Sequence, residues 1–102
     1  MEHRFVVIWT RESRTDLEDI FDFLAKDSIT AAGNVVGSIL DREQQLAQVA
    51  ESGPVQPTFG TRFTYRYLVE GNYKIIFHLS GSTVYVDTVF DTRQHPGKMR
   101  LK

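Results

Sequence analysis

The sequence predicts an α+β domain of order β-α-α-β-β-β, with an α-hairpin packed on one face of a small, mostly antiparallel sheet. Apolar residues recur at helical spacing through the first half of the chain. Three runs rich in β-branched and aromatic residues follow, separated by the hairpin turns Gly71-Asn72 and Ser80-Gly81-Ser82. With 102 residues and no internal repeat, the chain is expected to form one domain over residues 1–102.

The first half is predicted to hold one strand and both helices. Residues 4–9 are a short apolar run with β-branched content, typical of a buried strand. Thr10 is a suitable N-cap for the first helix. Its apolar stripe recurs at i, i+3, i+4 and i+7: Leu17, Ile20, Phe21 and Leu24. Thr30 is expected to cap a second helix that begins at Ala31 and continues to the stop signal Gly53-Pro54.

Two glycines lie one turn apart inside the second predicted helix. Gly33 and Gly37 each cost a helix about 1 kcal/mol relative to alanine. Close contact of this helix with the other helix or with the sheet explains them best, and simple tolerance is the alternative.

The second half is predicted to begin with a loop and continue as three strands. Residues 55–61 contain Pro57 and Gly60 and show no periodicity, so they form the loop. The strands are expected at residues 63–70, 73–79 and 83–90. If Gly71-Asn72 is a two-residue turn, Glu70 pairs with Tyr73, which sets the register of the central hairpin.

In that register Arg66 lies opposite Phe77, on the other strand face from Tyr65 and Tyr67. A guanidinium group in such apolar and aromatic sequence requires a partner. One interpretation stacks it on an aromatic ring and pairs it with a helix acid such as Asp19 or Asp22. The alternatives are contact with a partner protein and binding of a phosphate.

The charge is nearly balanced overall but unevenly distributed. The net charge is −1 and the pI is about 6.3, so the chain lacks the general basic field of proteins that bind nucleic acid without sequence preference. Acids are concentrated between residues 12 and 27. The C-terminal segment 93–102 is basic and contains no acid. It carries Arg93, His95, Lys98, Arg100 and Lys102.

Several classes of site and location are disfavoured. The chain has no cysteine, no apolar run near the length of about 20 residues that spans a bilayer, and no signal-peptide pattern, so a cytoplasmic protein is expected. The histidines share no metal-binding spacing, and His78 is expected to be a packing residue in a strand. No phosphate-binding glycine loop is present. We therefore expect neither a metal nor a cofactor.

Several strings, in this order and spacing, resemble the ParE branch of the RelE/ParE toxin superfamily of bacterial type II toxin–antitoxin systems. They are Ile8-Trp9-Thr10 followed by Asp16-Leu17-Glu18-Asp19-Ile20-Phe21-Asp22-Phe23-Leu24, then Tyr65-Arg66-Tyr67-Leu68, then Gly71-Asn72-Tyr73-Lys74-Ile75-Ile76-Phe77, and finally Val89-Phe90-Asp91-Thr92-Arg93-Gln94-His95-Pro96. The resemblance covers nearly the whole chain.

The resemblance implies one of two activities. RelE-like members are ribosome-dependent mRNA endonucleases, whereas ParE-like members typically act on DNA gyrase and are not known to cleave RNA. Members of both kinds are held inactive by a cognate antitoxin whose extended and helical segments wrap the toxin. DNA is then contacted only indirectly, through the antitoxin, and no membrane is involved.

The residue Asp91 favours the ParE-like activity. If Arg93 is aligned with the arginine of the family, Asp91 stands where some of the nucleases have a histidine, and a carboxylate cannot replace a protonated, phosphate-facing imidazole. The nearly neutral chain also suits a protein target better than ribosomal RNA. We therefore expect a toxin of the plasmid-stabilisation type that inhibits a protein such as DNA gyrase. Enzymatic activity is the less favoured alternative.

The expected contacts with target or antitoxin are a set of cationic side chains: Arg62, Arg66, Arg93, His95, Lys98 and Arg100. The first alternative is a RelE-like endoribonuclease that uses Arg62, Arg66, Arg93 and His95, the cations on the phosphate and the histidine as acid. A second alternative is a degenerate member that binds an antitoxin without being toxic.

Overall fold

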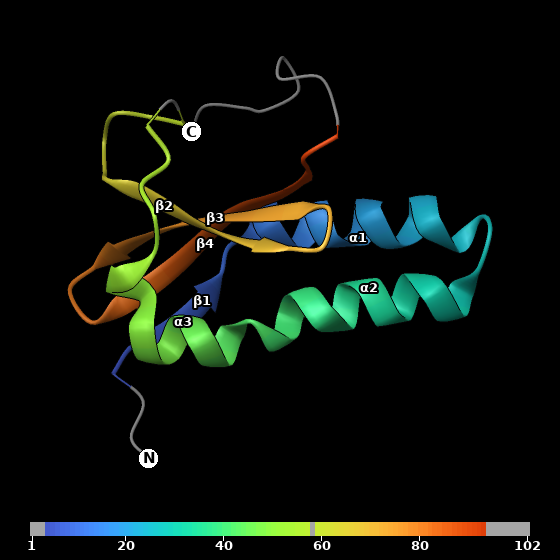
Figure 1. The fold of residues 1–102 in the computed structure, drawn as a ribbon, viewed down its shortest axis with the longest axis horizontal. Helices are drawn as coiled ribbons and strands as arrows, with labels where there is room; N and C mark the ends of the chain where they lie inside the picture. Colours follow the sequence, from blue (N-terminus) through green and yellow to red (C-terminus); the bar gives the residue numbers. More distant parts are fainter. Residues whose placement is uncertain (1–3, 58, 94–102) are drawn as a thin grey trace.

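A mixed sheet covered on one face by helices forms the fold (Figure 1). The computed structural model describes residues 4–57 and 59–93, and within them the sheet has four strands. The elements are β1 (Val6–Trp9), α1 (Arg11–Ala25), α2 (Ile29–Asp41), α3 (Glu43–Val49), the 3₁₀ turn η1 (Ala50–Ser52), β2 (Tyr65–Glu70), β3 (Tyr73–Ser80) and β4 (Thr83–Asp91). The predicted order and the α-hairpin on the sheet are confirmed.

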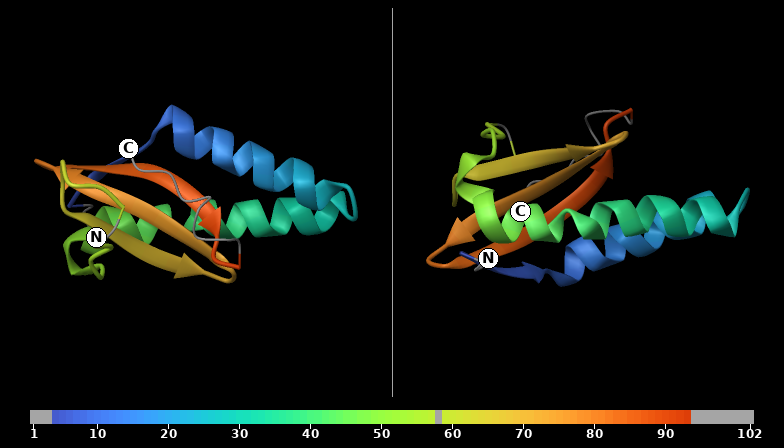
Figure 2. Two further views of the ribbon diagram at one scale, coloured as in Figure 1. Left: turned by 90° about the horizontal axis from the view of Figure 1, so that it is seen from above. Right: turned by 60° about the horizontal axis from the view of Figure 1, so that its bottom comes forward.

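The strands lie in the order β1-β4-β3-β2. β4 pairs antiparallel with β3, and β3 pairs antiparallel with β2, whereas β1 runs parallel to β4. Both views of Figure 2 show the helices on the same side of the sheet. The other face, which we call the outer face, is partly covered by the loop between η1 and β2, whose Phe59 packs on Tyr65 and Ile76. The predicted register of the central hairpin is confirmed: Glu70 pairs with Tyr73 and Arg66 with Phe77.

One helix cap was predicted correctly and the other was not. Thr10 has extended backbone angles, and its hydroxyl accepts a hydrogen bond from the Ser13 amide at 3.2 Å. The predicted cap at Thr30 is wrong, because α2 begins two residues earlier. Ser28 holds the extended backbone that an N-cap needs, and its hydroxyl accepts from the Ala31 amide at 3.0 Å.

The second predicted helix is broken at Arg42, which ends α2 and precedes α3. No proline or glycine marks this position, so sequence patterns give no sign of the break. The Arg42 side chain donates to the Val69 carbonyl at 3.0 Å and lies 3.3 Å from a Glu70 carboxylate oxygen. These contacts connect the break in the helices to the end of β2.

The expected close contact at the α2 glycines is also wrong. A Cβ built on Gly33 or Gly37 would meet nothing within 4 Å. Both positions face open space in the described structure, so packing within the chain does not require glycine there.

A β-bulge in β4 sets which side chains face the helices. Ile76 pairs with Thr88 and Phe77 with Val86, so Asp87 is the extra residue of β4. As a result, Val86 and Val89, three residues apart, both reach the helix side of the sheet. The Asp16 carboxylate of α1 accepts the Val89 amide at 3.0 Å and also the Thr88 hydroxyl, which fixes the strand just after the bulge.

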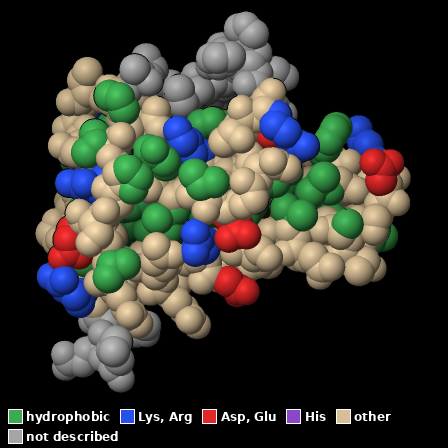
Figure 3. Space-filling view, viewed as in Figure 1, with side chains coloured by type: hydrophobic (Ala, Val, Ile, Leu, Met, Phe, Trp, Pro, Cys, Tyr) green, Lys and Arg blue, Asp and Glu red, His purple; other side chains and the backbone are tan. Residues whose placement is uncertain are grey.

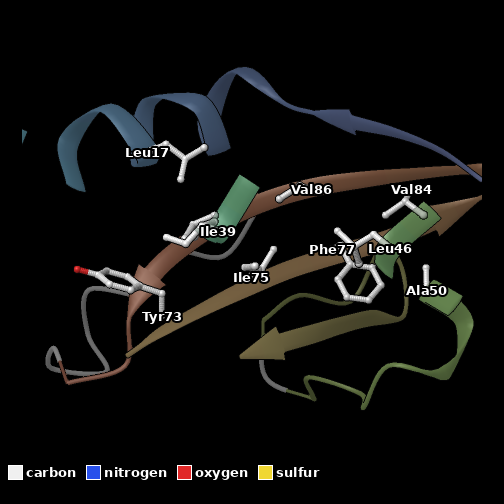
Figure 4. Close-up of a cluster of buried hydrophobic side chains, with 10 residues drawn as sticks. Leu17, Ile39, Leu46, Ala50, Tyr73, Ile75, Phe77, Val84 and Val86 are labelled. Carbon is white, nitrogen blue, oxygen red and sulfur yellow. The ribbon is translucent and has the colours of Figure 1, made fainter. Parts of the chain in front are cut away.

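The main hydrophobic core lies between the helices and the sheet (Figure 4). Its buried residues come from the three α-helices, η1, β3 and β4: Leu17, Ile39, Leu46, Ala50, Tyr73, Ile75, Phe77, Val84, Val86 and Val89. A second cluster of Phe59, Tyr65 and Ile76 lies on the outer face. The loop that supplies Phe59 pairs with the edge of β2, since the Gln56 amide donates to the Tyr65 carbonyl at 2.7 Å. The strands themselves begin two residues later than expected, at Val6 and Tyr65.

Candidate functional site

Arg66 meets a backbone carbonyl. Its Nη1 donates to the Gly53 oxygen at 2.6 Å, and its side chain is half-buried beside the core. This contact replaces the predicted pairing with Asp19 or Asp22, because the chain from Gly53 to Gln56 folds back along β2 and presents its carbonyl to the guanidinium group. Arg66 therefore holds residues 53–56, which we call the covering segment, against the sheet edge.

Arg93 meets Asp91, two residues before it. The guanidinium Nη2 lies 2.6 Å from Asp91 Oδ2, and its Nε and backbone amide both donate to Oδ1, at 2.9 and 2.8 Å. The hydrogen bonds from Arg93 lower the pKa of the Asp91 carboxyl below its usual value, against the opposing effect of burial. The pair neutralises much of the charge that Arg93 carries to the end of β4.

The neighbouring residue Thr92 ties this end of β4 to the central hairpin. Its amide and its hydroxyl both donate to the Asn72 carbonyl, at 2.7 and 2.8 Å. Tyr73, next to Asn72, pairs with Asp91 in the sheet, and burial followed by the Asp91 charge raises the pKa of its hydroxyl. Arg93 is thus held at a defined place, beside the turn between β2 and β3.

Arg62 lies at the other end of the same strands. Its guanidinium carbon lies 5.5 Å from the centre of the Phe63 ring, and its side chain is exposed. The Phe63 ring stacks on His78, with 4.0 Å between ring centroids and an interplanar angle of 11°. Through its contact with Phe63, Arg62 is held near His78 on the outer face of the sheet.

The structure does not bring the three arginines together. Arg62 lies near the row where Tyr65 pairs with His78, and Arg93 lies beyond the row where Tyr73 pairs with Asp91. These rows are five residues apart on β3, which is roughly 16 Å along a strand. Arg66 lies between them but on the helix side. On the face seen in Figure 3, Lys and Arg side chains are likewise scattered among hydrophobic ones.

Sequence reasoning missed the partner of His78. The ring is buried, and its Nδ1 lies 2.7 Å from Asp87 Oδ2, with Phe63 stacked on one side and Tyr85 stacked with a centroid distance of 5.3 Å. The prediction of a packing residue is confirmed. The pairing depends on the β4 bulge, which turns Asp87 toward the outer face, and no local sequence signal predicts that bulge.

Comparison with known proteins identifies the family. The model of the family described as the ParE toxin of the type II toxin–antitoxin system parDE matches residues 7–96. The chain belongs to the ParE toxin family. The resemblance seen in the sequence strings is thereby confirmed, and this protein is a ParE-type toxin of a type II toxin–antitoxin system.

A solved structure described as the chromosomal ParDE toxin–antitoxin system from P. aeruginosa shares the fold of this ParE-type chain. The two superpose with a TM-score of 0.73 at 22% sequence identity, over 88% of this chain and 98% of that chain. No curated protein matches the sequence significantly.

The remaining predicted contact residues of this ParE-type toxin, His95, Lys98 and Arg100, lie outside the described residues. Within the described ranges, no helix is long and apolar enough to cross a membrane. The same ranges hold no group of three or more His, Cys, Asp or Glu side chains suited to a metal ion.

Proposed function

We propose that this ParE-type toxin inhibits a protein target, DNA gyrase, and does not cut RNA. The separation of Arg62 from Arg93 along β3 carries this proposal. Phosphoryl transfer needs several cations converging on one phosphate, whereas a protein target can be contacted at widely spaced points. The Asp91 carboxylate, bound to Arg93, further disfavours approach of a phosphate to that end of the sheet.

We assign the target contacts to the exposed cations and not to Arg66, which is engaged with Gly53. Arg93 and the basic segment 93–102, with His95, Lys98 and Arg100, supply contacts at one end of the sheet. Arg62 supplies them at the other end. The acting protein is a single domain with this basic segment, and the location of gyrase makes its place of action the cytoplasm. A cognate antitoxin neutralises it and provides the link to DNA.

Purified toxin tests the proposal directly. We expect it to block supercoiling by DNA gyrase, and we expect Arg93→Ala to weaken this block while Arg14→Ala, an exposed arginine of α1, leaves it unchanged. In parallel, mRNA is incubated with ribosomes and toxin. Cuts at codon spacing that disappear in His95→Ala would contradict the proposal and favour the endoribonuclease. Absence of both effects, together with normal growth on expression, would leave a member that binds antitoxin without toxicity.

A further inference from the structure

The three arginines of the candidate site differ in the contacts that they already make inside the chain. Arg66 donates to the Gly53 carbonyl. Arg93 is paired with Asp91 at 2.6 Å. Arg62 is exposed and forms no ion pair within the described part of the chain. A carboxylate of a partner protein therefore meets no competing carboxylate at Arg62 among the described residues.

An aromatic ring holds Arg62 in place. The guanidinium carbon lies 5.5 Å from the centre of the Phe63 ring, which is a cation–π distance. Its charge is also felt at Tyr65, where burial and then Asp87 raise the pKa of the hydroxyl and Arg62 opposes the rise. A contact with a ring face restricts the long side chain but uses none of its five hydrogen-bond donors. Arg62 is thus held close to the sheet with its donors available.

Phe63 is in turn held by a stack of rings on the outer face. Its ring lies parallel to the His78 ring, with 4.0 Å between centroids and 11° between planes. Tyr85, which pairs with His78 across β3 and β4, also stacks on the imidazole, at 5.3 Å and 20°. We call Phe63, His78 and Tyr85 the ring stack. It connects Arg62, which follows a loop, to the two central strands of the sheet.

Asp87 fixes the ring at the centre of this stack. Its carboxylate Oδ2 lies 2.7 Å from His78 Nδ1, and the two side chains are only 12% and 10% exposed. The ring torsion of a histidine has broad minima, so a hydrogen bond to one ring nitrogen selects one orientation of the ring. Asp87 is the extra residue of the β4 bulge. The bulge therefore supplies the carboxylate that keeps the imidazole flat against Phe63.

We propose that Arg62 is the principal contact of this toxin with an acidic side chain of its target, and that His78 and Asp87 are positioning residues for it. They act through Phe63, whose ring face restricts the guanidinium group before the target arrives. Such pre-organisation lowers the entropic cost of binding. This inference rests on the proposed function for its partner, and it specifies which cation dominates the affinity and which residues hold it.

Inhibition of gyrase supercoiling by purified full-length variants tests the contact. We expect Arg62→Ala to raise the half-inhibitory concentration of toxin about tenfold or more. Arg93→Ala should raise it by a smaller factor, because Arg93 only exchanges one carboxylate partner for another. The matched control is Lys26→Ala. Lys26 lies 5.7 Å from the centre of the exposed Phe23 ring at the end of α1, and its loss should leave inhibition unchanged.

Variants of the ring stack test the positioning. Phe63→Leu should weaken inhibition by a factor comparable to that of Arg62→Ala, and the double variant should be no weaker than either, because residues that act as a unit are not additive. Asp87→Ala should also weaken inhibition. Asp87→Asn should retain most of it, since the amide oxygen still accepts a hydrogen bond from the His78 ring. Phe23→Leu is the control for loss of an exposed ring.

Nuclear magnetic resonance of the free toxin gives a readout that does not depend on the target. Protons above an aromatic ring resonate upfield, so the Cδ and Nε protons of Arg62 should be shifted in the wild type. We expect this shift to be lost in Phe63→Leu, to be reduced in Asp87→Ala and to be kept in Asp87→Asn. Circular dichroism checks that each variant is folded. The Phe63→Leu arm changes a side chain 36% exposed and does not require Asp87→Ala to fold.

The wild-type arm separates failure of this inference from failure of the proposed function. Wild-type toxin that leaves supercoiling unaffected defeats the proposed function, and the role of Arg62 with it. If the wild type inhibits, full inhibition by Arg62→Ala overturns the inference and leaves the proposed function standing. Additive losses in the double variant with Phe63→Leu, or an unchanged Arg62 shift in Asp87→Ala, overturn the positioning in the same way.

Discussion

Arg93 and Asp91 form a closed ion pair on the surface, with side chains 63% and 14% exposed. Any partner carboxylate that binds Arg93 must compete with an intramolecular one that is already placed at hydrogen-bond distance. The gain from a new contact is therefore the difference between two similar interactions, which makes Arg93 a residue for specificity more than for raw affinity.

Replacing Asp91 by asparagine should make the stability of the protein less dependent on pH. The folded pKa of Asp91 is depressed below the unfolded value of 3.8, so its contribution is present above that value and is lost as the pH falls through the folded pKa. We expect Asp91→Asn to be less stable than the wild type near pH 7 and equally stable in acid. Urea unfolding between pH 2 and pH 7 measures this. Arg93→Gln should show the same convergence, and a constant difference over the whole range would refute it.

A second residue-scale prediction concerns Gly53. A Cβ at this position would lie 2.9 Å from Cζ of Phe77, a fully buried ring, and 3.4 Å from the Tyr67 oxygen. We expect Gly53→Ala to lower the free energy of unfolding by about 1–3 kcal/mol through overpacking. The denaturant midpoint measures this, with Ser52→Ala on the exposed neighbouring turn as the control. An unchanged midpoint would show that the covering segment can shift away from the ring.

At the scale of the elements, α2 contains two glycines that lower its helix stability. Its two glycines face open space, so they weaken the helix without a packing advantage in the described structure. The exposure of Ile29 and Leu40, at 71% and 41%, shows that this helix also leaves apolar surface uncovered.

Substituting both glycines should therefore stabilise the protein. We expect Gly33→Ala and Gly37→Ala to add up to about 1 kcal/mol each to the free energy of unfolding. The matched control is Gly71→Ala in the turn of the central hairpin, where φ is +58° and an alanine is strained, so stability should fall. Thermal unfolding compares the three variants. A loss of stability in α2 would mean that the glycines make a contact outside the described residues.

The elements differ in how far the sequence could predict them. The turn Gly71-Asn72 fixes the hairpin register, because its two residues supply the turn geometry locally. The break at Arg42 could not be predicted, since no proline or glycine marks it and the side chain of Arg42 makes its contact with β2, 27 residues away along the chain. For the same reason Arg66 was assigned carboxylate partners: its carbonyl partner depends on the path of a loop without periodicity.

The candidate site was predictable in its residue types but not in its geometry. Arg62 and Arg93 are recognisable as exposed cations from the sequence. Their separation depends on strand register and on which loop end each one follows, and these are properties of the folded sheet. The pair of His78 and Asp87 depends in addition on a bulge that one extra residue creates.

For the molecule as a whole, tyrosines on both sides of the sheet should limit stability in alkali. Burial raises the pKa of Tyr65 on the outer face and of Tyr73 in the main core above the ordinary value of 10. Their contribution is thus present below pH 10 and is lost as the pH rises through the folded pKa values. We expect stability to decline above pH 10, and the decline to be smaller in the double variant Tyr65→Phe and Tyr73→Phe. Urea unfolding from pH 8 to pH 11 is the measurement, and identical pH profiles would contradict it.

The parallel pairing of β1 with β4 determines when the sheet can form during synthesis of the chain. Val6 pairs with Thr83, so β1, the earliest of the described strands in the chain, needs β4, the latest of them, before it has any neighbour in the described sheet. During synthesis β1 therefore waits with both of its edges unpaired while the helices and the central hairpin emerge. A chain that stops before Thr83 cannot complete the sheet. The finished surface, whatever partner it binds, exists only once translation of the whole domain is nearly over.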